Sequence, residues 1–443
     1  MTPAGAAPAD ATTAAIRAFA SRPRLLPLEG AVQHYDWGGR EFIPGLLGRA
    51  DPEARPFAEL WMGAHPRAPS TVLVDGTPVG LDALVAGAPE QVLGESDARR
   101  FAGRLPYLFK VIDARTMLSL QAHPSLAQAR SGFARENGAG IPLNAPERTY
   151  RDDNHKPEVQ AALSEFWMLH GFRPLQEIAD ALDAVPELAR LEPGFRALLR
   201  RAGADPGAGR GLLGALYGRL MTMQQPDVDL MVDPLIDRLE RDAPRNRDRH
   251  DYWALRAARS FPLPDGHRDR GIAAIYLLNL LHLRAGQGTF QSAGTLHAYL
   301  EGASVELMAN SDNVLRGGLT HKHVDAPGLL ETLTFEARRP LVLDGRQVSD
   351  TEWAYDAPVG EFLLSRIQPV PGKAHAETRE HGADCLIVLD GTARAVTEGD
   401  TMALPRGRAC LVPAGIAYLL EASEGPAMIY RARVPHAEDR GMP

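Results

Sequence analysis

Residues 105–124 read LPYLFKVIDARTMLSLQAHP, the strongest apolar stretch in this part of the chain. Its second half alternates apolar and polar side chains, namely Leu118, Ser119, Leu120, Gln121, Ala122 and His123. Alternation with a period of two predicts a β-strand with one buried face. Because side chains at i and i+2 emerge on the same face, the Gln121 amide and the His123 imidazole could reach one metal ion. The same pair is also compatible with an ordinary polar strand face.

The regions around this strand predict a mainly β protein. Residues 25–113 are short apolar runs broken by Gly and Pro, and the chain returns to this pattern beyond about residue 340. Short apolar runs separated by Gly and Pro are typical of antiparallel strands and turns in a sandwich or barrel. Between residues 174 and 257, apolar side chains recur at three- and four-residue spacing, which predicts amphipathic helices.

The chain of 443 residues is long enough for more than one domain. We expect the helical insert to form a lid or wall of a cleft in the first β domain. The expected division is a flexible lead-in at 1–24, a β domain built from 25–173 and 258–335, a helical insert at 174–257, and a second β domain at 336–443.

Composition narrows the possible partners and the kind of metal site. The formal net charge is -8 and no basic block stands out, so we expect no nucleic-acid partner. No secretory signal or membrane-spanning run is visible, which predicts a cytoplasmic protein with no membrane partner. With only Cys385 and Cys410, a disulfide scaffold or cysteine-rich metal site is excluded. Any metal would be bound mainly by His, Asp, Glu or amide oxygen.

Three further motifs carry chemically useful side chains. In NHKPE, residues 154–158, the proline favours extended geometry, so Lys156 and Glu158 could project in a common direction. His297 lies in AGTLHAYLEG at the start of an expected strand. SDNVLRGGLTHKH then offers Asp312, Arg316 and Lys322 beside glycines. Taken singly, each motif is equally compatible with a charged turn or a structural histidine.

Together the motifs closely resemble the signatures of type I mannose-6-phosphate isomerases, which belong to the cupin superfamily. The matching segments, in order, are ELWMGAHPRAPS, LFKV, LSLQAHP, DDNHKPE, GFRPL, LHAYLEG and SDNVLRGGLT. The resemblance covers most of the chain and implies two cupin-like antiparallel β-barrels or jelly rolls plus an all-α domain. It also implies a monomeric isomerase with one Zn²⁺ per chain. Its phosphosugar substrates would be D-mannose 6-phosphate and D-fructose 6-phosphate, interconverted through a metal-stabilised cis-enediol(ate) after ring opening.

The resemblance also implies roles for individual side chains. The family's zinc ligands are matched by Gln121, His123, Glu158 and His297. Catalytic residues around the sugar are matched by Lys156, His155, Asp312 and Arg316. Substrate-binding positions, including the phosphate end, are matched by Trp37, Lys110, Ser119, Tyr299 and Lys322. One departure is His321, where relatives usually have proline.

These residue types suit an aldose–ketose isomerisation. A divalent ion held by two imidazoles, an amide and one carboxylate keeps a positive charge that stabilises a developing oxyanion. Zinc suits this set, although manganese, cobalt, nickel or iron could also occupy it. Either Lys156 or His155 could be the base, whereas Arg316 is expected to stabilise charge or bind phosphate because guanidinium hardly deprotonates.

Two other functions remain compatible with the sequence. One is a zinc-dependent isomerase or epimerase acting on another phosphosugar. The other is a non-catalytic sugar-binding barrel whose metal is structural. In the second β domain, the spacing of His375, His381 and Asp384 matches no metal pattern, so we expect that domain to be structural.

Overall fold

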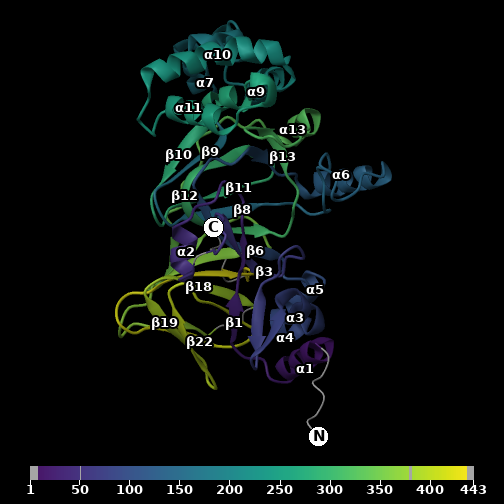
Figure 1. Ribbon diagram of the computed structural model, residues 1–443, viewed down its shortest axis with the longest axis vertical. Helices are drawn as coiled ribbons and strands as arrows, with labels where there is room; N and C mark the ends of the chain where they lie inside the picture. The colour runs from purple at the N-terminus through teal and green to yellow at the C-terminus, as the bar shows by residue number, and fades with distance from the viewer. Residues whose placement is uncertain (1–7, 50, 379–381, 437–443) are drawn as a thin grey trace.

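The computed structural model describes residues 8–49, 51–378 and 382–436 (Figure 1). Helices gather at one end of the elongated molecule, strands fill the middle, and a second group of strands with several helices forms the other end (Figure 1). His381 lies outside the described residues. Among the described residues, no helix combines the length and apolar character that crossing a membrane requires.

Ten strands form the sheet that carries most of the motif residues. They are β2 (Ala31–Gln33), β3 (Glu59–Gly63), β6 (Tyr107–Ala114), β7 (Leu120–Ala122), β8 (Glu158–Ala162), β9 (Phe166–Phe172), β10 (Leu278–Leu283), β11 (Gly288–Gln291), β12 (His297–Ala309) and β13 (Leu315–Gly318). The main path runs β10-β9-β12-β6-β3-β2, and β7, β8, β11 and β13 pair beside it.

The long strand β12 organises this sheet because it pairs with four others. Its first residues lie against β7 and β9, and its last residues lie against β6 and β8. The register shifts between Tyr299 and Glu301, and Gly302 follows with φ +128°. A Cβ at Gly302 would lie 2.5 Å from the carbonyl oxygen of Glu165, so only glycine fits this bend.

A nine-stranded sheet lies at the other end of the molecule. In order it contains β14 (Arg346–Ser349), β15 (Glu352–Tyr355), β16 (Leu363–Ile367), β23 (Met428–Arg433), β18 (Asp384–Asp390), β21 (Ala409–Val412), β1 (Leu26–Glu29), β4 (Thr71–Val74) and β5 (Thr77–Gly80). N-terminal strands thus share a sheet with C-terminal ones. A four-stranded sheet contains β17 (His375–Glu377), β22 (Tyr418–Ala422), β19 (Thr392–Val396) and β20 (Thr401–Pro405). Val388 and Leu420 belong to one buried cluster between the two sheets.

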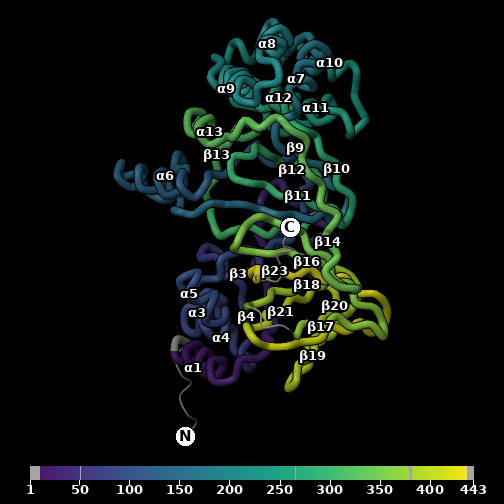
Figure 2. Tube along the Cα trace, turned by 180° about the vertical axis from the view of Figure 1, so that it is seen from behind, coloured from purple at the N-terminus to yellow at the C-terminus, as the bar shows by residue number. Residues whose placement is uncertain are grey.

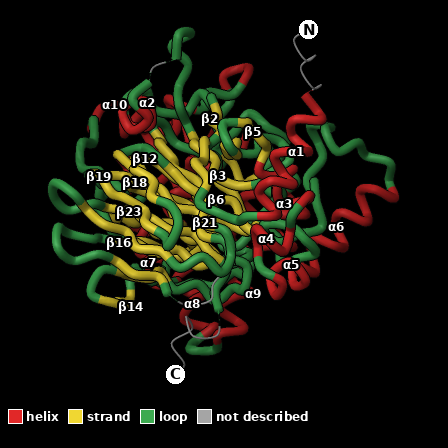
Figure 3. The backbone as a smooth tube through the Cα atoms, turned by 90° about the horizontal axis from the view of Figure 1, so that it is seen from below, coloured by secondary structure: helices red, strands yellow, loops and turns green. Residues whose placement is uncertain are grey.

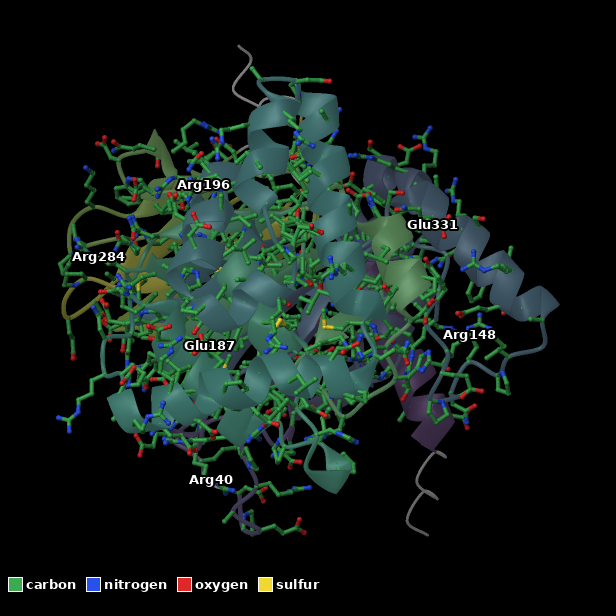
Figure 4. All side chains as sticks on the ribbon, turned by 90° about the horizontal axis from the view of Figure 1, so that it is seen from above. Arg40, Arg148, Glu187, Arg196, Arg284 and Glu331 are labelled. Atoms are coloured by element: carbon green, nitrogen blue, oxygen red, sulfur yellow. The ribbon has the colours of Figure 1, made fainter. Side chains whose placement is uncertain are left out.

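The helices of the insert pack on the ten-stranded sheet. They are α7 (Leu175–Ala184), η1 (Pro186–Arg190), α8 (Phe195–Ala202), α9 (Pro206–Thr222), α10 (Gln225–Asp242) and α11 (His250–Ser260). Leu216 and Trp253 from these helices share one buried cluster with Leu169 of β9. Figure 4 views this end of the molecule, with Glu187 and Arg196 on these helices and Arg148 beside a projecting arm.

The remaining helices connect or cover the sheets. They are α1 (Pro8–Ser21), α2 (Phe42–Leu47), α3 (Leu81–Gly87), α4 (Pro89–Leu93), α5 (Glu95–Arg100), α6 (Leu126–Gly138), η2 (Pro264–Gly266), α12 (Gly271–Ala274), η3 (Ile275–Leu277) and α13 (Ala326–Thr332). The projecting arm carries α6 (Figures 1 and 2). Helices α1, α3, α4 and α5 lie on one side of the strands (Figure 3).

The lead-in differs from the flexible segment predicted for residues 1–24. Residues 8–21 form α1, in which Ala15 and Phe19 are buried against the strands. Their i, i+4 spacing puts both side chains on one helix face, and burying that face stabilises the helix. Residues 1–7 lie outside the described ones.

The predicted mainly β architecture with a helical region is confirmed. Phe109, Val305 and Ile387, from the ten- and nine-stranded sheets, share one buried cluster, so the core continues from one sheet into the other. The strand orders are open paths, and the two closed cupin-like barrels stay a prediction. The boundaries proposed at residues 173, 257 and 335 also stay predictions.

Candidate metal centre

The β7–β12 pairing aligns three of the predicted metal ligands. His297, the first residue of β12, lies directly opposite Gln121 of β7. Residues directly opposite each other in an antiparallel pair present their side chains on the same face. His123 lies two positions beyond Gln121 and so follows the same face. Local strand geometry thus groups Gln121, His123 and His297.

The carboxylate of Glu158 lies between the two imidazoles. Its Oε1 is 3.4 Å from Nε2 of His123, and its Oε2 is 3.3 Å from Nε2 of His297. One ligand atom from each of the three residues lies within 4.8 Å of the others. All three side chains are buried, with at most 2% of each residue exposed. The geometry therefore matches a group of donors around one ion.

Each imidazole forms its hydrogen bond through Nδ1, on the side away from Glu158, so Nε2 is left facing Glu158 and available to a metal. Nδ1 of His123 donates to the carbonyl of Asn313 at 2.7 Å, and Nδ1 of His297 donates to the carbonyl of Thr295 at 2.9 Å. A carbonyl only accepts, so Nδ1 carries the proton of the neutral ring, and in that form Nε2 has the free lone pair. Among the described residues, neither Nε2 nor Oε2 of Glu158 has a hydrogen-bond partner. Buried polar atoms without partners are costly, and a shared cation would satisfy all three.

For His123 and Glu158, the electrostatics favour the protonation states that metal binding needs. Burial, reinforced by Lys156, lowers the pKa of His123 well below its usual value. Burial would raise the pKa of Glu158, but the charge of the Lys156 ammonium holds it well below its usual value. A neutral imidazole and an ionised carboxylate are the forms that bind a metal. The donor set thus fits zinc or another divalent ion.

The other predicted catalytic residues differ in how they relate to this cluster. Nζ of Lys156 is 3.2 Å from Oε1 of Glu158. Asp312 forms an ion pair with Arg67 at 2.9 Å and lies 3.6 Å from Nε2 of His65. Sequence reasoning did not assign a role to Arg67 or His65, although both lie within the quoted ELWMGAHPRAPS motif. His155 is directed elsewhere, as described below.

Lys110 and Tyr299 meet at a carboxylate that sequence reasoning missed. Glu306 lies opposite Lys110 in the β6–β12 pair, and its Oε1 is 2.8 Å from Nζ of Lys110. The Tyr299 hydroxyl donates to Oε2 of Glu306 at 2.6 Å. The sequence signal for Glu306 is weak, because it is one of two carboxylates in this segment, the other being Glu301, and its neighbours Val305 and Leu307 are apolar.

Arg151, Arg316 and Lys322 influence one another and have no carboxylate ion-pair partner among the described residues. Burial and the neighbouring Arg151 lower the pKa of Arg316. Burial, Arg316 and Arg151 lower the pKa of Lys322. Within the described part of the chain, no carboxylate forms an ion pair with Arg151, Arg316 or Lys322. Such a group favours an anion from outside the chain. Sequence reasoning did not identify Arg151.

Trp37 and Ser119 have fewer described contacts. The ring of Trp37 stacks on Tyr35 with centroids 5.7 Å apart, and Trp37 packs against the buried cluster that contains Tyr299. Ser119 is half-buried immediately before β7. Their assignment to the substrate stays a prediction.

Comparison with known proteins identifies the family. A family model described as "Phosphomannose isomerase type I, catalytic domain" matches residues 25–175. The mannose-6-phosphate isomerase of Salmonella typhimurium is 35% identical over 391 residues, which cover 87% of this chain and 94% of that relative. The human mannose-6-phosphate isomerase is 33% identical over 432 residues, which cover 93% of this chain and 98% of that relative.

Solved structures agree with these relatives. A phosphomannose isomerase variant from Salmonella typhimurium has a TM-score of 0.82 at 31% identity, covering 93% of this chain and 100% of that chain. A zinc-bound mannose 6-phosphate isomerase has a TM-score of 0.81 at 32% identity, with the same coverage. The predicted resemblance and the isomerase class are thereby confirmed. The chain belongs to the type I phosphomannose isomerase family.

Proposed function

We propose that this enzyme interconverts D-mannose 6-phosphate and D-fructose 6-phosphate with one zinc ion held by Gln121, His123, Glu158 and His297. The observation that carries the proposal is the buried cluster of His123, Glu158 and His297, whose inward-facing donors lack partners among the described residues. Lys156 lies beside this cluster, so a base and a metal site adjoin each other.

A zinc ion bound there supplies a Lewis acid that polarises the sugar carbonyl and stabilises negative charge on oxygen. The chain itself orients the ligands. The carbonyls of Asn313 and Thr295 fix the two imidazole rings, and Lys156 keeps Glu158 ionised. These contacts hold the donors in place before the substrate binds.

Arg316 and Lys322 bind the phosphate in this proposal, with Arg151 adding to the local positive charge. Their lack of carboxylate partners among the described residues leaves these charges available to an anion. Guanidinium binds phosphate oxygens through paired hydrogen bonds, which orient the sugar as well as bind it. Ser119 is expected at the same end of the substrate, while Trp37, Lys110 and Tyr299 border the sugar.

Lys156 is our choice for the proton transfer. As the neutral amine, its Nζ would take the proton from C2 of mannose 6-phosphate and return it at C1, through a cis-enediol of the open-chain sugar. Asp312, held by Arg67 and near His65, would move the proton during ring opening. His155 remains the alternative base.

The substrate preference tests this proposal. We expect a coupled assay to show turnover of mannose 6-phosphate and at least about a hundredfold lower kcat/KM for free mannose, because the phosphate contacts contribute about 3 kcal/mol. A preference for the free sugar would contradict the proposal. The predicted monomer in the cytoplasm is tested separately, by light scattering and by cell fractionation.

A further inference from the structure

The NHKPE segment contacts a residue from the C-terminal strands. Nε2 of His155 is 2.8 Å from Oε1 of Glu361, which lies between β15 and β16. Strand β16 lies where the nine-stranded sheet approaches the ten-stranded one (Figure 2). A side chain far along the chain therefore reaches the segment that carries Lys156 and Glu158.

Glu361 is anchored well enough to hold its partner. Its Oε2 accepts the backbone N–H of Gly360 at 3.0 Å, and the next residue, Phe362, is fully buried in the core. About a quarter of each side chain in the His155–Glu361 pair is exposed. The hydrogen bond from His155 is the largest influence that lowers the pKa of Glu361, so the carboxylate is ionised at neutral pH. Charged acceptors form the stronger hydrogen bonds.

The backbone geometry links this contact to the metal centre. Pro157 favours an extended conformation at Lys156, and neighbouring side chains of an extended segment emerge on opposite sides. Nζ of Lys156 contacts Glu158 at 3.2 Å, while the imidazole of His155 contacts Glu361. Holding His155 from one side therefore limits how far the Lys156 backbone can move on the other.

The other hydrogen bonds to this segment come from the ten-stranded sheet and its loops. Nδ2 of Asn154 donates to the carbonyl of Asn310 at 2.9 Å, and Nδ2 of Asn313 donates to the carbonyl of Asn154 at 2.9 Å. These bonds fix the residue before His155, and the backbone N–H of Ala309 donates to the carbonyl of Pro157 at 3.2 Å, on the other side of Lys156. The Glu361 contact fixes the segment one residue closer to Lys156.

We propose that Glu361 is a positioning residue for the isomerase reaction, acting on Lys156 through the imidazole of His155. The C-terminal strands then contribute to the geometry of the active site as well as to the fold. This inference rests on the proposed function, in which Lys156 transfers the proton.

The first test compares Glu361→Ala and Glu361→Gln with the wild-type enzyme at saturating zinc. Glu361→Ala is expected to lower kcat about 10- to 100-fold, the range that a shift of a reacting group by about 1 Å produces, with KM changed less than about threefold. Glu361→Gln is expected to lie in between, because its amide oxygen still accepts a hydrogen bond without the charge. An unchanged kcat in Glu361→Ala overturns the proposal. If that variant does not fold, an unchanged kcat in Glu361→Gln overturns it.

A double-mutant cycle with His155→Ala separates positioning from a general structural effect. If Glu361 acts through His155, adding Glu361→Ala to His155→Ala changes kcat by less than about twofold. If the fold-losses in kcat of the two single variants multiply in the double variant, Glu361 acts independently of His155. This result also overturns the proposal.

Asp356 provides a matched control near the same β15–β16 connection. Its two carboxylate oxygens accept hydrogen bonds from Arg346, each at 2.8 Å, away from the metal centre. Asp356→Ala is expected to keep kcat. A loss in this control equal to that of Glu361→Ala would mean general loosening of the segment and would overturn the proposal. Failure of the wild-type enzyme to convert mannose 6-phosphate would instead contradict the proposed function, so the two failures are distinguishable.

Discussion

Substitution of Glu158 by Gln should remove most of the stabilisation that zinc gives this protein. The Glu158 carboxylate contributes the only formal negative charge of the proposed ligand set and lies 3.3–3.4 Å from both imidazole nitrogens. Removing a group that merely orients a metal ligand costs roughly 10- to 100-fold in affinity, so losing the charged ligand should cost at least about 100-fold.

The size of the effect follows from linkage. At a zinc concentration about a thousandfold above Kd, the wild-type protein gains about 4.1 kcal/mol in its free energy of unfolding. If the variant binds zinc a hundredfold more weakly, the same zinc concentration is only about tenfold above its Kd. Zinc then adds about 1.4 kcal/mol to its free energy of unfolding. Glu158→Gln also leaves Lys156 without its ion-pair partner, so the zinc-dependent increment, and not the absolute stability, is the diagnostic quantity.

Urea unfolding with and without zinc measures this increment, and competition with a chelating dye gives Kd directly. Glu136→Gln is the matched control, because Glu136 is a buried carboxylate that accepts the backbone N–H of Tyr150 at 2.8 Å outside the metal centre. The control should lose stability but keep the full zinc increment. An increment in Glu158→Gln equal to that of the wild type would refute the assignment of Glu158 as a ligand.

Three further changes have outcomes that the structure predicts. Glu306→Gln leaves Glu59, at 3.8 Å, as the ion-pair partner of the buried Lys110 ammonium among the described residues, and it should cost about 3–5 kcal/mol of unfolding free energy. A loss below about 1 kcal/mol in urea denaturation would contradict this. Arg316→Ala should lower kcat/KM for mannose 6-phosphate about 10- to 150-fold, and unaltered kinetics would exclude a phosphate contact. Burial raises the pKa of Asp113 to about 6 from 3.8, so the native state binds more protons than the unfolded state between these pH values. The free energy of unfolding should therefore fall as pH rises from about 4 to about 6. Asp113→Asn should flatten that slope in pH-dependent unfolding, and an unchanged slope would contradict the role of Asp113.

Local patterns predicted the elements better than they predicted the pairing of those elements. The alternation around Gln121 indicated a strand, and β7 forms there. The pairing of β1 with β21 could not be predicted, because it joins segments near the two ends of the chain. The bend at Gly302 depends on the approach of the Glu165 carbonyl, which is a tertiary contact without a local signal. Helix α1 likewise gains its stability from burial of Phe19.

The same limit applies to the site. His123, Glu158 and His297 were predicted from motifs, and the structure brings them together. Glu306 and Arg151 were not, because their proximity to Lys110 and Arg316 depends on strand register and loop packing. Glu361 carries no motif, and only the packing of β16 near the NHKPE segment reveals its contact with His155.

Chelation followed by zinc addition in a coupled mannose 6-phosphate assay measures whether turnover depends on the metal. Metal analysis of the same samples should accompany the rates, because the buried site could retain zinc against a chelator. We predict that activity falls in proportion to the metal removed and returns when about one zinc per chain is restored. Full activity in protein shown to be free of divalent metal would contradict the account.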